Sequence, residues 1–233
     1  MEVYRTDFAV RAKADKSPVT EADERAEAYV LQKLGKLAPG IPAVGEELYA
    51  AGGRPDISGG RFWLVDALDG TTEFTKRGED FTVNIALIEK GAPVLGVVHA
   101  PALALTFWGS PAGAFRSRGD GAAEHIQARL PAADGLVSLT SKSHRSQEDE
   151  FLKDYAIKAD IPRGSSLKLC LLAAGEADIH PRLGPTSEWD IAAGHAVLNA
   201  AGGSIVALDG SGTLRYGKAN VLNPTFVARG RMA

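Results

Sequence analysis

The chain has 233 residues, of which 45% are hydrophobic and 24% charged, and its formal net charge is −3. This length can bury a substantial core, and the acidic balance gives no overall basic field for nucleic acid or an anionic membrane. The single cysteine, Cys170, excludes an intramolecular disulfide and zinc sites of the finger type. Charges interrupt the apolar runs, so we expect no signal peptide and no transmembrane segment. The expected location is the cytoplasm, with peripheral attachment to the inner membrane left open.

The first part of the chain predicts one helix and two strands. Thr20, which is followed by two acidic residues, has the pattern of a helix start, and Gly35 is expected to end that helix. Apolar residues recur at helical spacing between these two positions. Short apolar runs at 41–44 and 62–65 are predicted strands, and acidic residues follow each of them.

The remainder predicts a meander and then an alternation of strands and helices. Alternating apolar residues across 81–115, with a turn at Glu89-Lys90-Gly91, indicate antiparallel strands. After about residue 130 the pattern changes, which we interpret as a boundary between two subdomains. Beyond it we expect three strands and three helices; the strands are 135–141, 204–210 and 220–228, and the helices are 147–155, 165–179 and 191–203.

The most informative segment is WLVDALDGTT, which places two carboxylates at the end of a predicted strand. If a tight Asp-Gly turn follows Asp66, then Asp69 and the carbonyl of Leu68 return to the same place. Three oxygen ligands so close together suit a hard cation such as Mg²⁺. Thr71 and Thr72 then open a helix, whose free N–H groups could hold a phosphate. The alternative is a simple Asp-Gly turn after a core strand.

Two further acidic positions follow the same logic. Glu46 comes directly after a predicted strand, although a solvated acidic loop would have the same pattern. Asp190 precedes a predicted helix, where it could be an N-cap or a metal ligand. The histidines lack ligand spacing, so zinc is not indicated, and His195 is expected to be a packed core residue.

Taken together, GEE, WLVDALDGTTEF and SEWDIAAGHAVLNAAGG resemble the three motifs of the inositol monophosphatase superfamily, which are Mg²⁺-dependent, lithium-sensitive phosphatases. Between the motifs, SPVTEAD, RGEDFTVNIALIEKGAPVLGVVHAP and GSSLKLCLLAAGEADIHPRLGPTSEWDIAAGHAV resemble the bacterial 3'(2'),5'-bisphosphate nucleotidases. The resemblance covers nearly the whole chain. It implies an α/β fold, the layered αβαβα sandwich of sugar phosphatases. Residues 1–130 would carry the metal motifs, and residues 131–233 would close the active site.

The resemblance also implies roles for individual residues. Two or three Mg²⁺ ions would be held by Glu46, Asp66, the Leu68 carbonyl, Asp69 and Asp190. Asp23 and Thr71 would position and activate the attacking water. Ser165, Ser166 and Lys168 would hold the second phosphate or the sugar of the substrate. The alternative for these three residues is an ordinary serine N-cap followed by a solvated lysine. The residues expected to contact substrate are Glu46, Leu68, Asp69, Gly70, Thr71, Ser165, Ser166, Lys168 and Asp190.

We therefore predict a phosphatase that removes the 3'-phosphate of adenosine 3',5'-bisphosphate, giving AMP and phosphate, in sulfur assimilation or nucleotide recycling. The alternative substrates are inositol monophosphate or a sugar phosphate, and the alternative class is a non-catalytic Mg²⁺- or nucleotide-binding protein. The expected partner is a small bisphosphate nucleotide, with no nucleic acid, and the protein would be a monomer or homodimer. The chain departs from the family pattern in two ways. Ala67 stands where family members usually have proline. Family chains also have a further helix before the point matching Met1, and we expect either that this member lacks the helix or that the sequence begins after it.

Overall fold

The computed structural model of the protein describes residues 1–12, 18–141 and 145–232. It contains two main β-sheets, of seven and five strands, and two short ladders of two strands each. The chain passes from the large sheet to the small sheet between Ile126 and Leu136. The division of the chain into two functional halves stays a prediction.

The large sheet confirms the predicted meander. Its strands lie in sequence order, and all neighbours are antiparallel except the first pair. Alternation of side chains places one set of apolar residues on the core face of each strand. The strands are β3 (Ala43–Gly45), β4 (Arg61–Asp69), β5 (Thr82–Glu89), β6 (Ala92–Ala100), β7 (Leu105–Ser110), β8 (Gly113–Arg118) and β9 (Glu124–Ile126).

The small sheet has the order β11-β10-β12-β16-β14 and mixes parallel with antiparallel pairs. Its strands are β10 (Leu136–Ser141), β11 (Ile157–Arg163), β12 (Ile179–Arg182), β14 (Ser204–Ala207) and β16 (Phe226–Arg229). The two ladders pair β1 (Val10–Ala12) with β2 (Pro18–Thr20), and β13 (Thr186–Ser187) with β15 (Leu222–Asn223).

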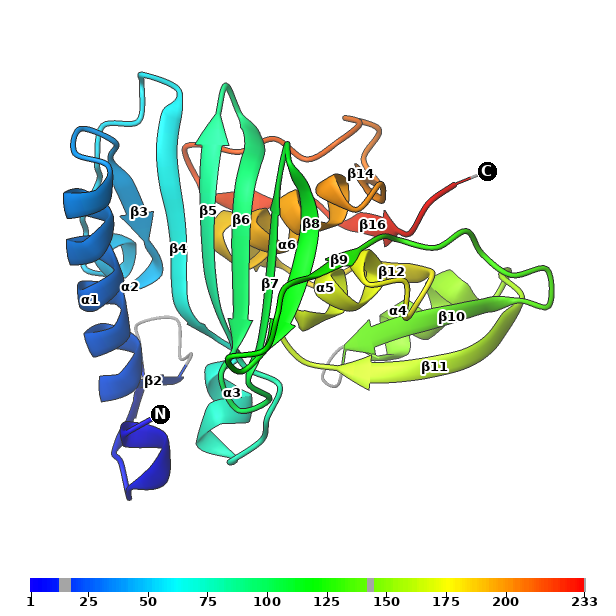
Figure 1. Ribbon diagram of the computed structural model, residues 1–233, viewed down its shortest axis with the longest axis horizontal. Coiled ribbons are helices and arrows are strands. Elements are labelled where there is room, and N and C mark those ends of the chain that lie inside the picture. The colour runs from blue at the N-terminus through cyan, green and yellow to red at the C-terminus, as the bar shows by residue number, and fades with distance from the viewer. Residues whose placement is uncertain (13–17, 142–144, 233) are drawn as a thin grey trace.

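Helices separate and cover the two sheets. They are η1 (Val3–Arg5), α1 (Glu21–Leu37), α2 (Glu46–Ala50), α3 (Thr71–Thr75), α4 (Arg145–Leu152), α5 (Leu167–Ala173) and α6 (Glu188–Ala200). Helix α1 packs on one side of the large sheet, and α6 packs on β5, β6 and β7 from the other side. Helix α5 lies between α6 and the small sheet, and α4 packs against β10 and β12 (Figure 1). The predicted αβαβα sandwich is therefore confirmed.

The differences from the predicted elements include two helix ends and one strand that was not predicted. Gly35 lies inside α1, which continues to Leu37, because a glycine in a helix interior costs only about 1 kcal/mol and does not by itself end the helix. The helix predicted at 165–179 ends at Ala173, since Gly175 has a left-handed φ of 70°. Strand β11 had no prediction, because its polar sequence lacks clear alternation.

Two glycines let α6 lie directly on the large sheet. Gly96 of β6 and Gly109 of β7 are register partners, and both face α6. A Cβ atom at Gly96 would overlap the carbonyl oxygen of Ala193, and one at Gly109 would lie 2.6 Å from the Cα of Val197. Larger side chains would therefore push the helix, which carries Asp190 in its first turn, away from the sheet.

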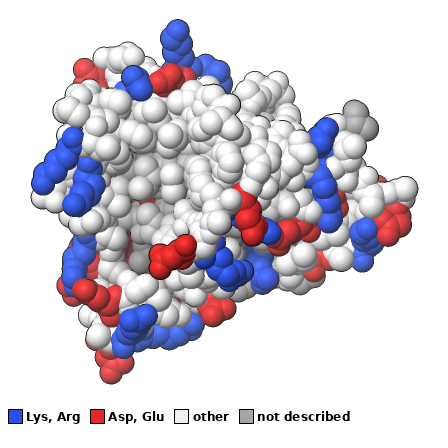
Figure 2. All heavy atoms as spheres, in the orientation of Figure 1, with Lys and Arg blue, Asp and Glu red and all other residues white. Residues whose placement is uncertain are grey.

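Charges on the surface are mixed in sign. Figure 2 shows the described residues of one face, on which basic and acidic side chains alternate around the rim and a hollowed, mostly uncharged area lies near the centre. In the described ranges, no helix has the length and apolar character needed to span a membrane.

We expect Gly96→Ala to destabilise the fold and Gly35→Ala to stabilise it. The first change inserts a methyl group into a closed contact, and overpacking of this kind costs about 1–3 kcal/mol. The second places alanine in a helix where nothing lies within 4 Å of the new Cβ, which is worth about 0.5–1 kcal/mol. Urea denaturation of both variants measures this, and equal stability of the two would contradict the packing account.

Candidate active site

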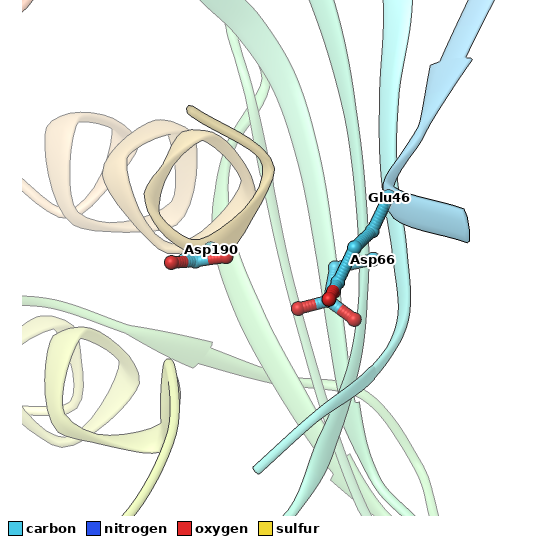
Figure 3. A group of neighbouring side chains, drawn as sticks. All are labelled: Glu46, Asp66 and Asp190. Carbon is cyan, nitrogen blue, oxygen red and sulfur yellow. The ribbon is translucent and has the colours of Figure 1, made fainter. Parts of the chain in front are cut away.

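Three carboxylates from distant segments meet between the large sheet and α6. Glu46 is the first residue of α2, Asp66 lies within β4, and Asp190 is in the first turn of α6. One carboxylate oxygen from each residue lies within 4.8 Å of the others. Figure 3 shows Asp190 facing Glu46 and Asp66 across the gap between α6 and the sheet. The three acidic segments of the sequence thus converge in space.

The local structure after Asp66 differs from the predicted tight turn. Strand β4 continues to Asp69, and its pairing with β5 shifts register between Asp66 and Asp69, so the extra residues form an irregularity within the strand. The backbone N–H of Leu68 donates to Oδ1 of Asp66 at 2.9 Å. Gly70 then leads into α3, which begins at Thr71 as predicted.

Asp69 lies beside the cluster with one oxygen fully engaged. Its Oδ2 accepts from the backbone N–H of Ser166 at 2.6 Å, from Nδ2 of Asn84 at 3.2 Å and from the hydroxyl of Thr82 at 3.4 Å. Asp69 is not among the three carboxylates that lie within 4.8 Å of one another. The structure thus brings it near the other carboxylates but ties it to α5.

Asp190 is the third residue of α6 rather than its N-cap. Ser187 occupies the N-cap, and its backbone N–H donates to Oδ2 of Asp190 at 2.8 Å as part of a capping box. The alternative prediction, that Asp190 is the N-cap residue, was therefore wrong: Asp190 takes part in capping from the third helical position. The capping bond uses Oδ2, and a carboxylate oxygen of Asp190 still lies within 4.8 Å of the Glu46 and Asp66 oxygens.

Burial and mutual repulsion dominate the electrostatics. Burial raises the pKa of Asp66 well above its usual value, and the neighbouring charges of Glu46, Asp69 and Asp190 raise it further. The pKa of Asp190 is also raised well above its usual value, first by burial and then by Asp69 and Glu46. A cation would relieve this repulsion, and a set of carboxylate oxygens fits a hard divalent cation.

Asp23 and Thr71, which are predicted to share a role, are in direct contact. The hydroxyl of Thr71 lies 3.0 Å from Oδ1 of Asp23 and 3.2 Å from the carbonyl oxygen of Leu68. Oδ2 of the buried Asp23 accepts from the backbone N–H and the hydroxyl of Thr20, at 2.8 and 2.7 Å. This capping box fixes the carboxylate of Asp23 at the start of α1.

Glu27 is a buried residue of the site that the sequence analysis missed. It lies one turn after Asp23 in α1, and its carboxylate accepts from the backbone N–H groups of Glu47 and Leu48, at 2.8 and 2.7 Å. A Cβ atom at Gly45 would lie 2.5 Å from that carboxylate, so the glycine before Glu46 makes room for Glu27. The i, i+4 spacing of two acidic residues on α1 was the available signal.

A cavity of about 290 Å³ adjoins the carboxylates. Asp69, Gly70 and Asp190 form part of its lining, and Ser165 and Ser166 form another part. The basic side chains in its lining are Lys76, Arg163, Lys168 and Arg182. Of these only Lys168 was predicted; the others follow no motif, and only the fold brings them to one cavity. The cavity thus combines an anionic end with several cations.

The segment at the start of α5 is neither an ordinary cap nor solvated. Ser166 is the N-cap, yet its hydroxyl makes no capping bond and instead donates to the carbonyl of Asp190. Lys168 is 6% exposed, and its Nζ donates to the carbonyls of Arg163 and Ser165 at 3.2 and 3.0 Å. Burial, followed by repulsion from Arg182, lowers the pKa of Lys168 to about 8.

His195 lies outside the site, as predicted. It is buried in α6, its Nδ1 lies 2.8 Å from the hydroxyl of Tyr216, and burial lowers its pKa to about 4. It is a neutral core residue at physiological pH.

Comparison with known proteins gives consistent relatives. The model of the inositol monophosphatase family matches residues 1–231. The 3'(2'),5'-bisphosphate nucleotidase CysQ of Salmonella typhimurium is 45% identical over 92% of this chain and 86% of its own. Its counterpart from Escherichia coli K12 is 42% identical, over 97% and 92%. Among solved structures, CysQ of Bacteroides thetaiotaomicron has a TM-score of 0.81 and 32% identity, over 99% of this chain and 91% of that one. An IMPase of Thermotoga maritima has a TM-score of 0.76 and 27% identity, over 97% and 83%.

We expect Asp66→Asn to raise the melting temperature of the metal-free protein by a few degrees and to abolish its stabilisation by Mg²⁺. Asparagine can still accept the Leu68 N–H bond, so the substitution removes only a buried like charge. Thermal unfolding in EDTA and in millimolar Mg²⁺ measures both effects. The matched control is Asp56→Asn, because exposed Asp56 accepts an equivalent bond from the N–H of Ser58. Stabilisation by Mg²⁺ that persists in Asp66→Asn would refute the assignment of this ligand.

Proposed function

This chain belongs to the inositol monophosphatase family, and from that premise we propose that it is a Mg²⁺-dependent 3'(2'),5'-bisphosphate nucleotidase. Its substrate is adenosine 3',5'-bisphosphate, which it converts to AMP and phosphate, in keeping with a role in sulfur assimilation. The names of the relatives at 42–45% identity support this choice. The observation that carries it is the cavity, which is lined by four basic side chains together with Asp69 and Asp190. Through Asp190 the cavity adjoins the carboxylate cluster with Glu46 and Asp66.

The carboxylates of Glu46, Asp66 and Asp190 would hold Mg²⁺, and Asp69 and the Leu68 carbonyl would complete two or three sites. Bound there, Mg²⁺ would supply Lewis-acid stabilisation of the charge that develops on the phosphoryl and leaving oxygens. The residues themselves hold their positions through the bonds to Leu68, Ser187 and Ser166 described above.

Thr71 and Asp23 orient the water that attacks phosphorus. Asp23 is fixed by two bonds from Thr20, so its remaining oxygen draws the hydroxyl hydrogen of Thr71 toward itself. The lone pairs of the Thr71 hydroxyl are then available to accept a hydrogen bond from a water molecule. Holding the nucleophile in this way removes much of the entropic barrier to attack.

The basic side chains of the cavity bind the second phosphate of the substrate, the one that is not hydrolysed. Arg163 is exposed, lines the cavity, and makes no side-chain hydrogen bond or ion pair to the described residues. Lys168 lies deeper, and its charge is maintained below pH 8 or so. The hydroxyl of Ser165 is a further donor in this lining. Charge-assisted hydrogen bonds are worth about 1.5–3 kcal/mol each.

We expect kcat/KM for adenosine 3',5'-bisphosphate to exceed that for inositol 1-phosphate by at least about tenfold, which corresponds to ~1.4 kcal/mol. Only the bisphosphate has a second anionic group that can reach the basic side chains while the first is at the carboxylates. Phosphate release measured side by side on both substrates, with and without Mg²⁺, tests this. A higher kcat/KM for inositol 1-phosphate would favour the alternative function, an inositol or sugar phosphatase.

We further expect Arg163→Ala to lower kcat/KM for the bisphosphate about tenfold while leaving inositol 1-phosphate turnover unchanged. One charge-assisted bond is lost, and the exposed position means that folding is preserved. The control is Arg61→Ala, because exposed Arg61 pairs with Glu89 and does not line the cavity. Equal losses on the two substrates would show that Arg163 does not contact the second phosphate.

A further inference from the structure

Asn84 occupies a buried position between the carboxylates and the start of α5. It lies in β5, is fully buried, and is the register partner of Asp66. Its amide nitrogen, Nδ2, donates to Oδ2 of Asp69 at 3.2 Å and to the hydroxyl oxygen of Ser166 at 3.0 Å. One planar group thus contacts two chain segments that both line the cavity.

Ser166 extends this connection to a third segment. Its backbone N–H donates to the same Oδ2 of Asp69, and its hydroxyl donates to the carbonyl oxygen of Asp190. Strand β4, helix α5 and helix α6 are therefore joined by a continuous set of hydrogen bonds through Asn84 and Ser166. The start of α5 also contains Ser165 and Lys168, which line the basic part of the cavity.

The amide of Asn84 is satisfied on one side only. Its Oδ1 is buried and has no hydrogen-bond partner among the described residues. A buried acceptor without a partner destabilises a fold, and an apolar side chain of the same shape, such as leucine, would avoid that cost. Local rules are broken in this way mainly at functional sites. The two N–H donors of Asn84 therefore matter for the site more than for stability.

We propose that Asn84 is a positioning residue that fixes the distance between the carboxylates and the second-phosphate side of the cavity, and so determines selectivity for bisphosphates. This inference rests on the function proposed above. Asn84 touches neither phosphate; it acts through Asp69 and Ser166. Without its two donors, Oδ2 of Asp69 loses a partner and the start of α5 can shift relative to β4.

The experiment compares Asn84→Leu with Ser138→Ala as control. Ser138 is equally buried and donates to Asp160 at 2.7 Å, but it lies in β10 and does not line the cavity. In Asn84→Leu we expect the ratio of kcat/KM for adenosine 3',5'-bisphosphate to that for inositol 1-phosphate to fall at least fivefold or so. The Mg²⁺ concentration that gives half of the maximal thermal stabilisation should rise about threefold, because Asp69 is less well oriented. Neither quantity should change in Ser138→Ala.

A double-mutant cycle separates positioning from direct contact. Ser166→Ala removes the other end of the link, so the selectivity of Asn84→Leu/Ser166→Ala should be no lower than that of the poorer single variant. Additive losses, or wild-type selectivity in folded Asn84→Leu, would overturn the proposal. If Asn84→Leu does not fold, Asn84→Ala, which also removes both donors, replaces it in the same cycle, and retained selectivity in that variant overturns the proposal equally. Preference of the wild-type protein for inositol 1-phosphate would instead overturn the proposed function.

Discussion

The repulsion between buried carboxylates is the constraint around which this molecule is organised. Asp66 and Asp190 have pKa values well above the usual range because burial and neighbouring carboxylates both oppose ionisation. The fold tolerates this because backbone N–H groups hold one oxygen of each side chain. Leu68 does so for Asp66, Ser187 for Asp190 and Ser166 for Asp69. The repulsion between these carboxylates therefore favours binding of a cation. In its absence, backbone N–H donors hold the carboxylate side chains in position.

Helix starts supply much of this compensation. Helices α1, α2, α3, α5 and α6 all begin beside the carboxylates, and the first turns of four of them contain Asp23, Glu46, Thr71 and Asp190. Free N–H groups and the positive end of the helix dipole favour negative charge at this position. The same arrangement that steadies the carboxylates also favours a phosphate in the adjoining cavity. Layering of helices between two sheets makes such a convergence possible, because helices that follow strands begin at the same edge.

Sequence reasoning was most successful where the signal is local. Alternation gave the meander of β5 to β8, and acidic residues at strand ends or helix starts pointed to Glu46, Asp66 and Asp190. It failed where long-range pairing decides the outcome: β11 is polar and is held by its pairing with β10. Asn84 and Arg163 were missed for the same reason. An asparagine in an alternating strand, or an arginine before a glycine, has no distinctive pattern until the fold brings it to the cavity.

The contact between Asp69 and Ser166 uses the main chain of Ser166, which has a consequence for how this scaffold diversifies. A backbone N–H is present whatever residue other than proline occupies position 166, so other substitutions there leave that contact in place. Side chains at 163 and 165 face the cavity without holding the carboxylates. Substitutions at 163 and 165 can therefore change which substrate binds while the carboxylates that carry out hydrolysis stay in place. Related proteins with new substrate preferences would then differ in the side chains of this one wall of the cavity and share the same hydrolytic reaction.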